Sequence, residues 1–338
     1  MRNWYRGQRS YVLAAASGPL MKSSRLLFSG IAFVLLASAT LFSKGRDVVA
    51  LGTATPGGGF PVYGAALAEI VNQADPSLDV RPRNTRGSTE NVPLLEAGKL
   101  DIALVQGEAA QDAFSGPGHP VERLKIIAAM YPTPGMFTVP ADSPSRSIRD
   151  LIGKRVVFGA RGSGLVLLAR DLLDGLGLDM DRDFTAVYLE RAGDGPAMVL
   201  DGRADALWGG GTGWPGFEAL AEPPGGARFI TPDGGEIDRI MAKHPALRRL
   251  TVPAGSYPGQ DAPLHSVGSW SLILARPRLP DSVAYRLARA LHRSEDLLAA
   301  RLPQARETTM ANTVAVAPGR DRIHPGVLRY LREIGLVR

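Results

Sequence analysis

The chain has 338 residues and no cysteine. This absence excludes disulfide bonds, zinc–thiolate sites, thiol nucleophiles and a lipid anchor on a modified cysteine. Histidine is scarce, and none of the five histidines belongs to an HExxH pattern or to a pair four residues apart. We therefore expect no metal site. The GxxxxGK[ST] pattern of nucleotide-binding loops and the Gly-x-Ser-x-Gly pattern of hydrolases are also absent. These absences favour a binding protein without a cofactor over an enzyme.

The formal net charge of +6 is unevenly distributed along the chain. Residues 1–46 hold seven basic side chains and no acidic one, whereas the remainder holds 32 basic and 33 acidic side chains. A nucleic-acid-binding protein would concentrate basic groups on its folded body. The body is nearly neutral, so nucleic acid is not an expected partner.

Residues 26–42 contain seventeen residues without a charge, preceded by Lys22 and Arg25 and ending near Ala37 and Ala39. This arrangement is typical of a secretory signal peptide. A helix of that length spans about 25 Å, which is shorter than a hydrocarbon core of about 30 Å. An uncleaved anchor is the alternative, because a bilayer can thin around a short helix. Under both interpretations residues 1–45 form a separate N-terminal segment and the body is periplasmic.

From residue 47 onward, short apolar runs alternate with segments of helical periodicity. This alternation is typical of α/β proteins with mostly parallel sheets. Two halves each open with a strand, a glycine-rich loop and a helix, and Ser88 is a plausible N-cap. Two final helices, at 280–300 and 325–334, are expected to cover one half. Strands are predicted at 47–51, 80–83, 102–105, 155–158, 204–208 and 267–275.

The glycine-rich loops at 52–60 and 159–164 each lead from a predicted strand into a predicted helix. Backbone N–H groups in such a loop face a ligand at the positive end of the helix dipole, which favours an anion. The same glycines would also suit tight turns and close packing. Arg86 and Arg161 lie where a guanidinium can either clamp a carboxylate or remain in solvent.

Gln106 follows the buried strand at 102–105, and ligands of open α/β sheets bind at such strand ends. A capping role for Gln106 is the alternative. Trp208, Trp214 and Phe60 suit either the walls of a pocket or ordinary packing. The residues that we predict to contact a ligand are Thr55, Gly58, Phe60, Arg86, Ser88, Asn91, Gln106, Arg161, Ser163, Gly164 and Trp208.

Seven sequence fragments between residues 47 and 338 resemble, in order, the TAXI class of solute receptors of tripartite ATP-independent periplasmic (TRAP) transporters. They include Gly87-Ser88-x-Glu90-Asn91, the segment DIALVQ at 101–106 and the segment PAGSYPGQD at 253–261. The resemblance implies an α/β type II periplasmic-binding-protein fold, with two lobes, a hinge and a ligand cleft between the lobes. It places lobe one at 46–135 plus 263–338 and lobe two at 136–262. It also implies an organic acid, such as glutamate or another dicarboxylate, and a TRAP-type permease as partners.

Some positions depart from this family pattern. Thr133 stands where the family often has glutamate, and Arg86 and Arg161 stand where it often has small residues or proline. Glutamate specificity therefore does not carry over, and two arginines facing one cleft would favour a dianionic ligand. Two alternatives stay open. One is a receptor for an ABC importer of a sulfonate, nitrate or similar anion, and the other is a membrane-tethered sensor or accessory domain.

Overall fold

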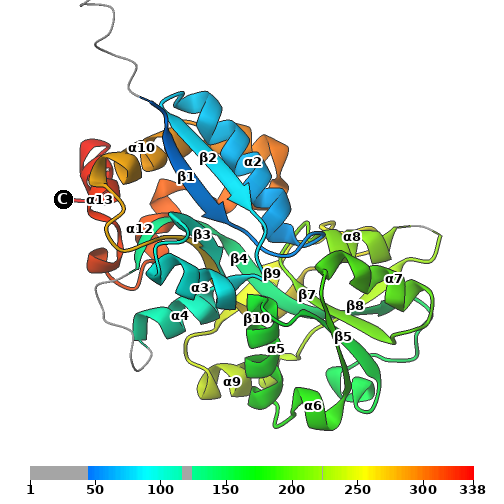
Figure 1. Ribbon diagram of the computed structural model, residues 1–338. Helices are drawn as coiled ribbons and strands as arrows, with labels where there is room; N and C mark the ends of the chain where they lie inside the picture. The colour runs from blue at the N-terminus through cyan, green and yellow to red at the C-terminus, as the bar shows by residue number, and fades with distance from the viewer. Residues whose placement is uncertain (1–44, 116–123, 223) are drawn as a thin grey trace, which may run out of the picture. The chain divides into compact units, whose positions relative to one another are not determined.

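The strands expected from the sequence join into one continuous sheet (Figure 1). The computed structural model describes residues 45–115, 124–222 and 224–338, and within them the sheet has ten strands. The expected signal peptide or anchor at 26–42 lies outside the described residues. Among the described residues, no helix is both long and apolar enough to cross a membrane. Residues 46–338 form one compact unit, to which the description below applies.

Five strands form the sheet of the first lobe, and the fourth runs opposite to its neighbours. In sheet order they are β2 (Leu78–Arg83), β1 (Asp47–Gly52), β3 (Ile102–Val105), β10 (Leu264–Ala275) and β4 (Lys125–Pro140). β1 is parallel to β2 and β3, whereas β10 is antiparallel to β3 and β4. Every residue of β3 is buried, as its uninterrupted apolar sequence predicts. Pro82 lies in β2 at the sheet edge, where its missing N–H breaks no ladder.

Helices cover both faces of this sheet (Figure 1). One face carries α2 (Gly59–Ala74), α10 (Asp281–His292), α11 (Glu295–Arg301) and α13 (Pro325–Glu333), and the other carries α3 (Ser88–Glu96) and α4 (Gly107–Ser115). A further helix, α12 (Met310–Val316), packs against β4. The prediction that the last helices cover one half is confirmed. The prediction for Ser88 as an N-cap is wrong, because Gly87 is the N-cap of α3 and Ser88 is its first residue.

The second lobe repeats the same strand order. Its strands are β6 (Thr185–Leu189), β5 (Arg155–Ala160), β7 (Ala206–Gly210), β4 and β8 (Ala227–Ile230). β5 is parallel to β6 and β7, and β4 again enters as the antiparallel fourth strand. The helices of this lobe are α5 (Gly164–Gly175), α6 (Met180–Asp183), α7 (Gly195–Leu200), α8 (Pro215–Ala221) and α9 (Gly234–Lys243).

Two long strands belong to both lobes. Residues 125–134 of β4 pair with β10, and residues 135–140 pair with β7 and β8. The first residues of β10 pair with β9 (Arg248–Val252), and the last pair with β3. The expected fold, two α/β lobes joined by crossing strands, is therefore confirmed. Because the crossing strands are shared between sheets, the lobe boundaries at 135 and 262 stay our proposal.

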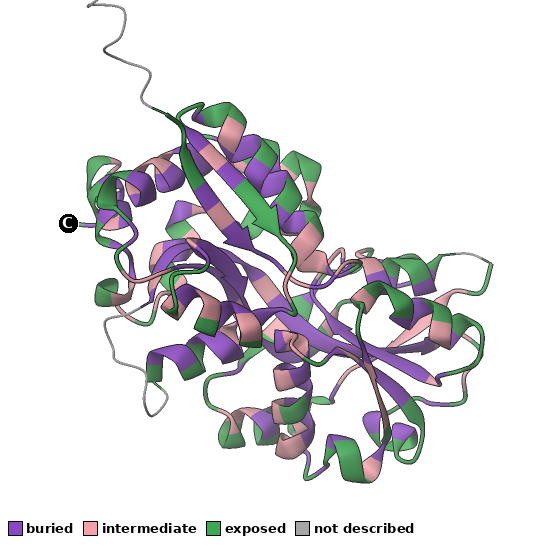
Figure 2. Ribbon diagram, in the orientation of Figure 1, coloured by how far each residue is buried: buried purple, intermediate pink, exposed green. Residues whose placement is uncertain are grey.

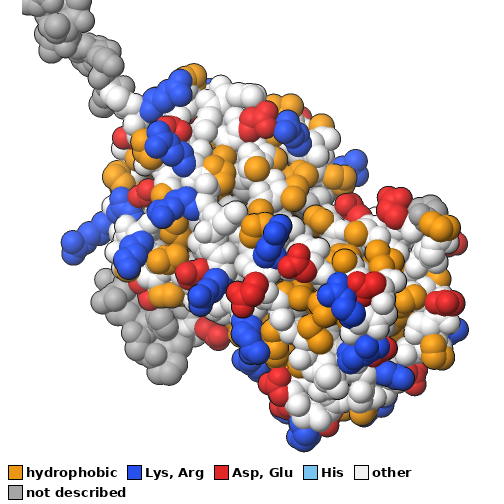
Figure 3. Space-filling model, turned by 45° about the vertical axis from the view of Figure 1, so that its right-hand side comes forward, with side chains coloured by type: hydrophobic (Ala, Val, Ile, Leu, Met, Phe, Trp, Pro, Cys, Tyr) orange, Lys and Arg blue, Asp and Glu red, His pale blue; other side chains and the backbone are white. Residues whose placement is uncertain are grey.

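Burial follows the layered arrangement. Figure 2 shows the central strands buried, and the second half of the edge strand β2 and the outer faces of the helices exposed. Separate apolar clusters fill the two lobes, with Leu51 and Leu104 in the first and Phe158 and Trp208 in the second. Figure 3 shows acidic and basic side chains interspersed on one face of the body, in keeping with its near-neutral composition.

Candidate functional site

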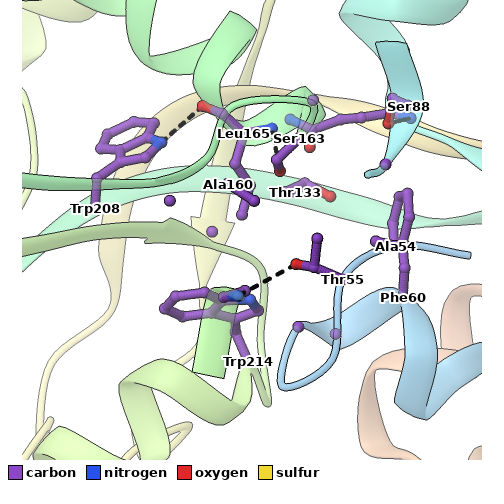
Figure 4. A pocket seen from close by; sticks show the side chains of 18 of the residues that line it. Ala54, Thr55, Phe60, Ser88, Thr133, Ala160, Ser163, Leu165, Trp208 and Trp214 are labelled. Atoms are coloured by element: carbon purple, nitrogen blue, oxygen red, sulfur yellow. Dashed lines mark hydrogen bonds between the residues drawn. The ribbon is translucent and has the colours of Figure 1, made fainter. Parts of the chain in front are cut away.

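A pocket lies between the lobes, where loops from both sheets meet (Figure 4). The first lobe contributes the loop before α2, the turn before α3, the end of β3 and the middle of β4. The second lobe contributes the end of β5, the loop before α5, and residues from β7 and the turn before α8. The cavity volume is about 60 Å³, which corresponds to about two waters at their share of about 30 Å³ each in the liquid. A ligand that fits this conformation is therefore small.

Four helices begin at the pocket. α2 starts at Gly59, α3 at Ser88 and α5 at Gly164, and each of these residues lines the pocket. α4 starts at Gly107, directly after the lining residue Gln106. Each helix N-terminus carries about half a positive charge, concentrated on N–H groups of its first turn. The pocket is therefore electropositive without requiring any cationic side chain.

Aromatic side chains form much of the pocket wall. Phe60, Tyr131, Phe158, Trp208 and Trp214 all line it. Trp208 and Trp214 are 1% and 8% exposed, so both rings are held rigidly. The indole N–H of Trp208 donates to the carbonyl oxygen of Leu165 at 2.8 Å (Figure 4), which fixes this ring. Burial raises the pKa of Tyr131, so its hydroxyl keeps its proton at neutral pH. These walls suit an apolar part of a ligand.

The polar side chains that line the pocket are neutral. They are Thr55, Ser88, Gln106, Thr133 and Ser163. No Asp, Glu, Lys, Arg or His is among the lining residues in the described part of the chain. The hydroxyl of Ser88 accepts the backbone N–H of Gln106 at 3.1 Å, which orients the turn into α4. The side-chain nitrogen Nε2 of Gln106 is buried and has no hydrogen-bond partner among the described residues.

The two lobes contact each other on both sides of the pocket. On one side, the N–H of Gly193 donates to the carbonyl oxygen of Pro56, and the N–H of Ala192 donates to Oγ1 of Thr55, both at 3.2 Å. The approach is close, because a Cβ on Gly57 would lie 2.3 Å from the Cα of Gly193. Gly57 also has φ of +82°, a left-handed conformation that favours glycine.

On the other side of the pocket, the carbonyl oxygen of Gly162 accepts hydrogen bonds from Thr89. The backbone N–H donates at 3.2 Å and the hydroxyl at 3.0 Å. A Cβ on Gly162 would lie 2.6 Å from the Cβ of Arg86. The glycines of both loops thus allow the lobes to meet around the pocket, in a closed arrangement.

Most of the predicted contact residues line the pocket. Those that do are Thr55, Gly58, Phe60, Ser88, Gln106, Ser163, Gly164 and Trp208. Asn91 does not, because it is fully buried beneath the turn, where Nδ2 donates to the carbonyl oxygens of Thr53 and Leu104 at 2.8 Å each. Its contribution is to hold β1 and β3 together at the ends that carry the pocket loops.

Neither predicted arginine lines the pocket. Arg86 is exposed, and its backbone N–H donates to the Glu90 carboxylate. Arg161 is also exposed, and its guanidinium carbon lies 4.1 Å from the ring centre of Tyr188, in a cation–π contact. The expected clamp of two arginines in one cleft is therefore not formed in this conformation.

The pocket also contains residues that were not among the predicted contacts. Tyr131 and Thr133 come from the middle of β4, and Phe158 and Leu207 come from the central strands of the second lobe. Their apolar neighbours in the sequence indicate only core strands. Tyr131 and Thr133 reach the pocket because β4 crosses between the lobes, and no local pattern signals that crossing. In the described part of the chain, no group of three or more acidic or histidine side chains could hold a metal ion.

Comparison with known proteins gives one family match and several structural likenesses. A protein from Bordetella bronchiseptica RB50 has a TM-score of 0.50 and 15% identity, and the match covers 85% of this chain and 89% of that one. At this identity the likeness concerns the fold alone. The alkanesulfonate-binding protein SsuA from Xanthomonas axonopodis pv. citri, bound to MOPS, has a TM-score of 0.48 and 19% identity, with 86% and 85% of the chains covered. A putative L-cystine ABC transporter protein from Listeria monocytogenes has a TM-score of 0.48 and 15% identity, and the match covers 78% of this chain and 98% of that one. The model of the NMT1-like family matches residues 51–335, and the chain therefore belongs to that family.

Proposed function

We propose that this protein is an extracytoplasmic solute-binding receptor that closes its lobes on a small organic anion and delivers it to a membrane permease. The observation that carries the proposal is the pocket where four helix N-termini meet between two lobes. An anion placed there gains the field of the helix dipoles and can accept hydrogen bonds from N–H groups. The neutral hydroxyls and the Gln106 carboxamide add donors without adding charge.

The ligand that fits this chemistry is a carboxylate with a short apolar part. The aromatic walls suit the apolar part, and the small volume limits its length. A dicarboxylate is less well supported, because no cationic side chain among the described lining residues balances a second negative charge. A sulfonate presents the same single charge and three acceptor oxygens, so the test below includes sulfonates.

The proposed partner and location rest on sequence features. The fragments that resemble TAXI receptors favour a TRAP-type permease, and the uncharged stretch at 26–42 favours export to the periplasm. An ABC importer is the alternative partner, since receptors of both transporter classes share this fold. Co-purification of the receptor with permease subunits encoded beside its gene distinguishes the two classes.

A thermal-shift screen of the full-length protein tests the function. The panel contains short monocarboxylates, dicarboxylates and alkanesulfonates, each paired with its uncharged amide. A ligand at 100 times its dissociation constant stabilises the fold by about 2.7 kcal/mol, which is a shift of several degrees. We expect acids to raise the melting temperature and their amides to leave it unchanged. If the amides shift it equally, or no acid shifts it, the proposal fails.

A further inference from the structure

Glu108 is buried without a hydrogen-bond partner. It lies in the first turn of α4, two residues after Gln106, and is 7% exposed. Both carboxyl oxygens lack a hydrogen-bond partner among the described residues, as does the hydroxyl of Ser269 in the crossing strand β10. An ionised carboxylate buried without a well-formed hydrogen bond costs several kcal/mol of free energy, and protonation removes the part of this cost that comes from the charge. The closed structure therefore favours a neutral Glu108.

The position of Glu108 makes its burial depend on the lobes. α4 belongs to the first lobe and packs against α5 of the second, and Leu167 of α5 contacts the apolar cluster around α4. Asp171, also on α5, is close enough to act electrostatically on Glu108. Ser269 stands against the start of α4, since a Cβ on Gly107 would lie 2.4 Å from its Oγ. A hinge motion that parts α4 from α5 would expose the carboxyl group to water.

Glu108 borders a second cavity, of about 500 Å³. It lies between α4, the end of α12, the crossing strand β10 and the segment before β9. Glu108, Ser269 and Trp270 line it together with Arg248. This cavity is separate from the ligand pocket, because the described residues that line the two do not overlap.

Asp171 on α5 acts on Glu108 with a negative charge and so does not neutralise it. Asp112 on α4, Arg170 and Asp174 on α5 and His244 after α9 surround Asp171, and Arg248, the first residue of β9, lines the cavity. β10 and the end of α12 contribute uncharged residues to this cavity. Burial raises the pKa of Glu108 to about 7, and the negative charge of Asp171 acts in the same direction. The N–H of Glu108 itself and the nearby side chains of Ser269 and Gln106 act to lower this pKa, but burial outweighs them.

We propose that Glu108 takes up a proton when the lobes close, so that closure on the ligand is coupled to pH. The inference rests on the proposed function, because it assumes a receptor that opens and closes. In the open state the exposed carboxyl group titrates near the ordinary value of 4.5, against about 7 in the closed state. Closure therefore takes up a proton between these values. The ratio of closed to open protein therefore falls by up to about tenfold per pH unit as pH rises from 4.5 to 7. Outside that range it changes little.

The absence of cysteine allows the opening to be measured directly. Val48 in β1 and Leu200 in α7 lie in different lobes and are 52% and 65% exposed. Replacing both with cysteine gives the full-length protein two unique sites for spin labels. We expect pulsed electron resonance on the ligand-free protein to show a larger short-distance population at pH 5 than at pH 8. The ratio of closed to open forms should fall at least tenfold between these values.

Two substitutions in the labelled protein test whether Glu108 or another carboxylate causes this pH dependence. Glu108→Gln keeps a neutral side chain of the same shape, so its closed population should be independent of pH and at least as large as that of the unsubstituted protein at pH 5. Glu69→Gln is the control, because it removes a carboxylate that pairs with Arg301 on the surface. It should leave the pH dependence intact.

The inference is overturned if the distance distribution of the wild-type sequence does not change between pH 5 and pH 8. It is equally overturned if Glu108→Gln retains the wild-type pH dependence. If Glu108→Gln fails to fold, the comparison of the wild-type distance distribution at pH 5 and pH 8 still tests the inference. A protein that binds acids in the thermal-shift screen but closes independently of pH would refute only this coupling, not the proposed receptor function.

Discussion

Replacing Gly57 with alanine tests whether ligand binding requires the interlobe contact. A Cβ there would lie 2.3 Å from the Cα of Gly193, whereas non-bonded carbon atoms approach to about 3.5–4.0 Å. The two loops must therefore separate by more than about 1 Å. Two hydrogen bonds across this contact, each 3.2 Å long, would then exceed the usual limit for such bonds.

The expected loss follows from these two bonds. Each contributes about 0.5–1.5 kcal/mol, so their combined loss weakens closure by about 1–3 kcal/mol. Ligand affinity should fall by about 5- to 150-fold. Titration calorimetry measures it, with the acid that gives the largest thermal shift as the probe.

Gly153→Ala is the matched control for this substitution. Gly153 has φ of +77°, close to that of Gly57, but a Cβ there would meet no atom within 4 Å. Both variants place alanine in the left-handed region, which costs about 1–2 kcal/mol of stability. Gly57→Ala should lower the melting temperature at least as much as Gly153→Ala does, and only Gly57→Ala should lose affinity. Equal affinity of the two variants would show that binding does not depend on this contact.

Two further predictions concern charged side chains. Arg86→Ala and Arg161→Ala should each keep the affinity for the acid within about twofold of the wild-type value in calorimetry, because neither guanidinium lines the pocket. A tenfold loss in either variant would show that the arginine reaches the ligand. Burial acts to raise the pKa of Asp75, but hydrogen bonds from Ser77 and Arg289 outweigh it and lower the pKa. Ionised Asp75 therefore stabilises the fold above its ordinary pKa, and this stabilisation is lost as pH falls. Asp75→Asn should cost about 1–3 kcal/mol in urea unfolding at pH 7 and less below about pH 4, and a constant difference would contradict this role.

Local sequence patterns predicted most of the elements. The uninterrupted apolar run at 102–105 became the buried strand β3, and the glycine loop at 159–164 leads into α5. These features depend on neighbours along the chain, through side-chain period and backbone freedom. The same patterns brought Thr55, Ser88, Gln106 and Ser163 to the pocket, because parallel strands end on a common edge.

Long-range pairing decided the remaining features of the site. Arg161 occupies a predicted loop, but its guanidinium turns outward onto Tyr188, and loop spacing does not encode side-chain direction. Thr133 enters the pocket because β4 pairs with strands of both lobes. The unpredicted lining residues of this pocket belong to apolar strands. An apolar strand sequence does not distinguish a strand that borders a core from one that borders a cleft.

The sequence by itself determined an α/β body with a near-neutral charge, no thiol chemistry and two glycine loops that lead into helices. These properties are sums over residues or patterns of near neighbours. The tertiary structure alone decided that four helix N-termini meet in one uncharged pocket and that Glu108 is buried where α4 meets α5. Both features arise from contacts between segments far apart in the chain. The electrostatic environment of a site depends on those contacts, because it is set by which charges and dipoles lie within a few ångströms and by how much water is excluded.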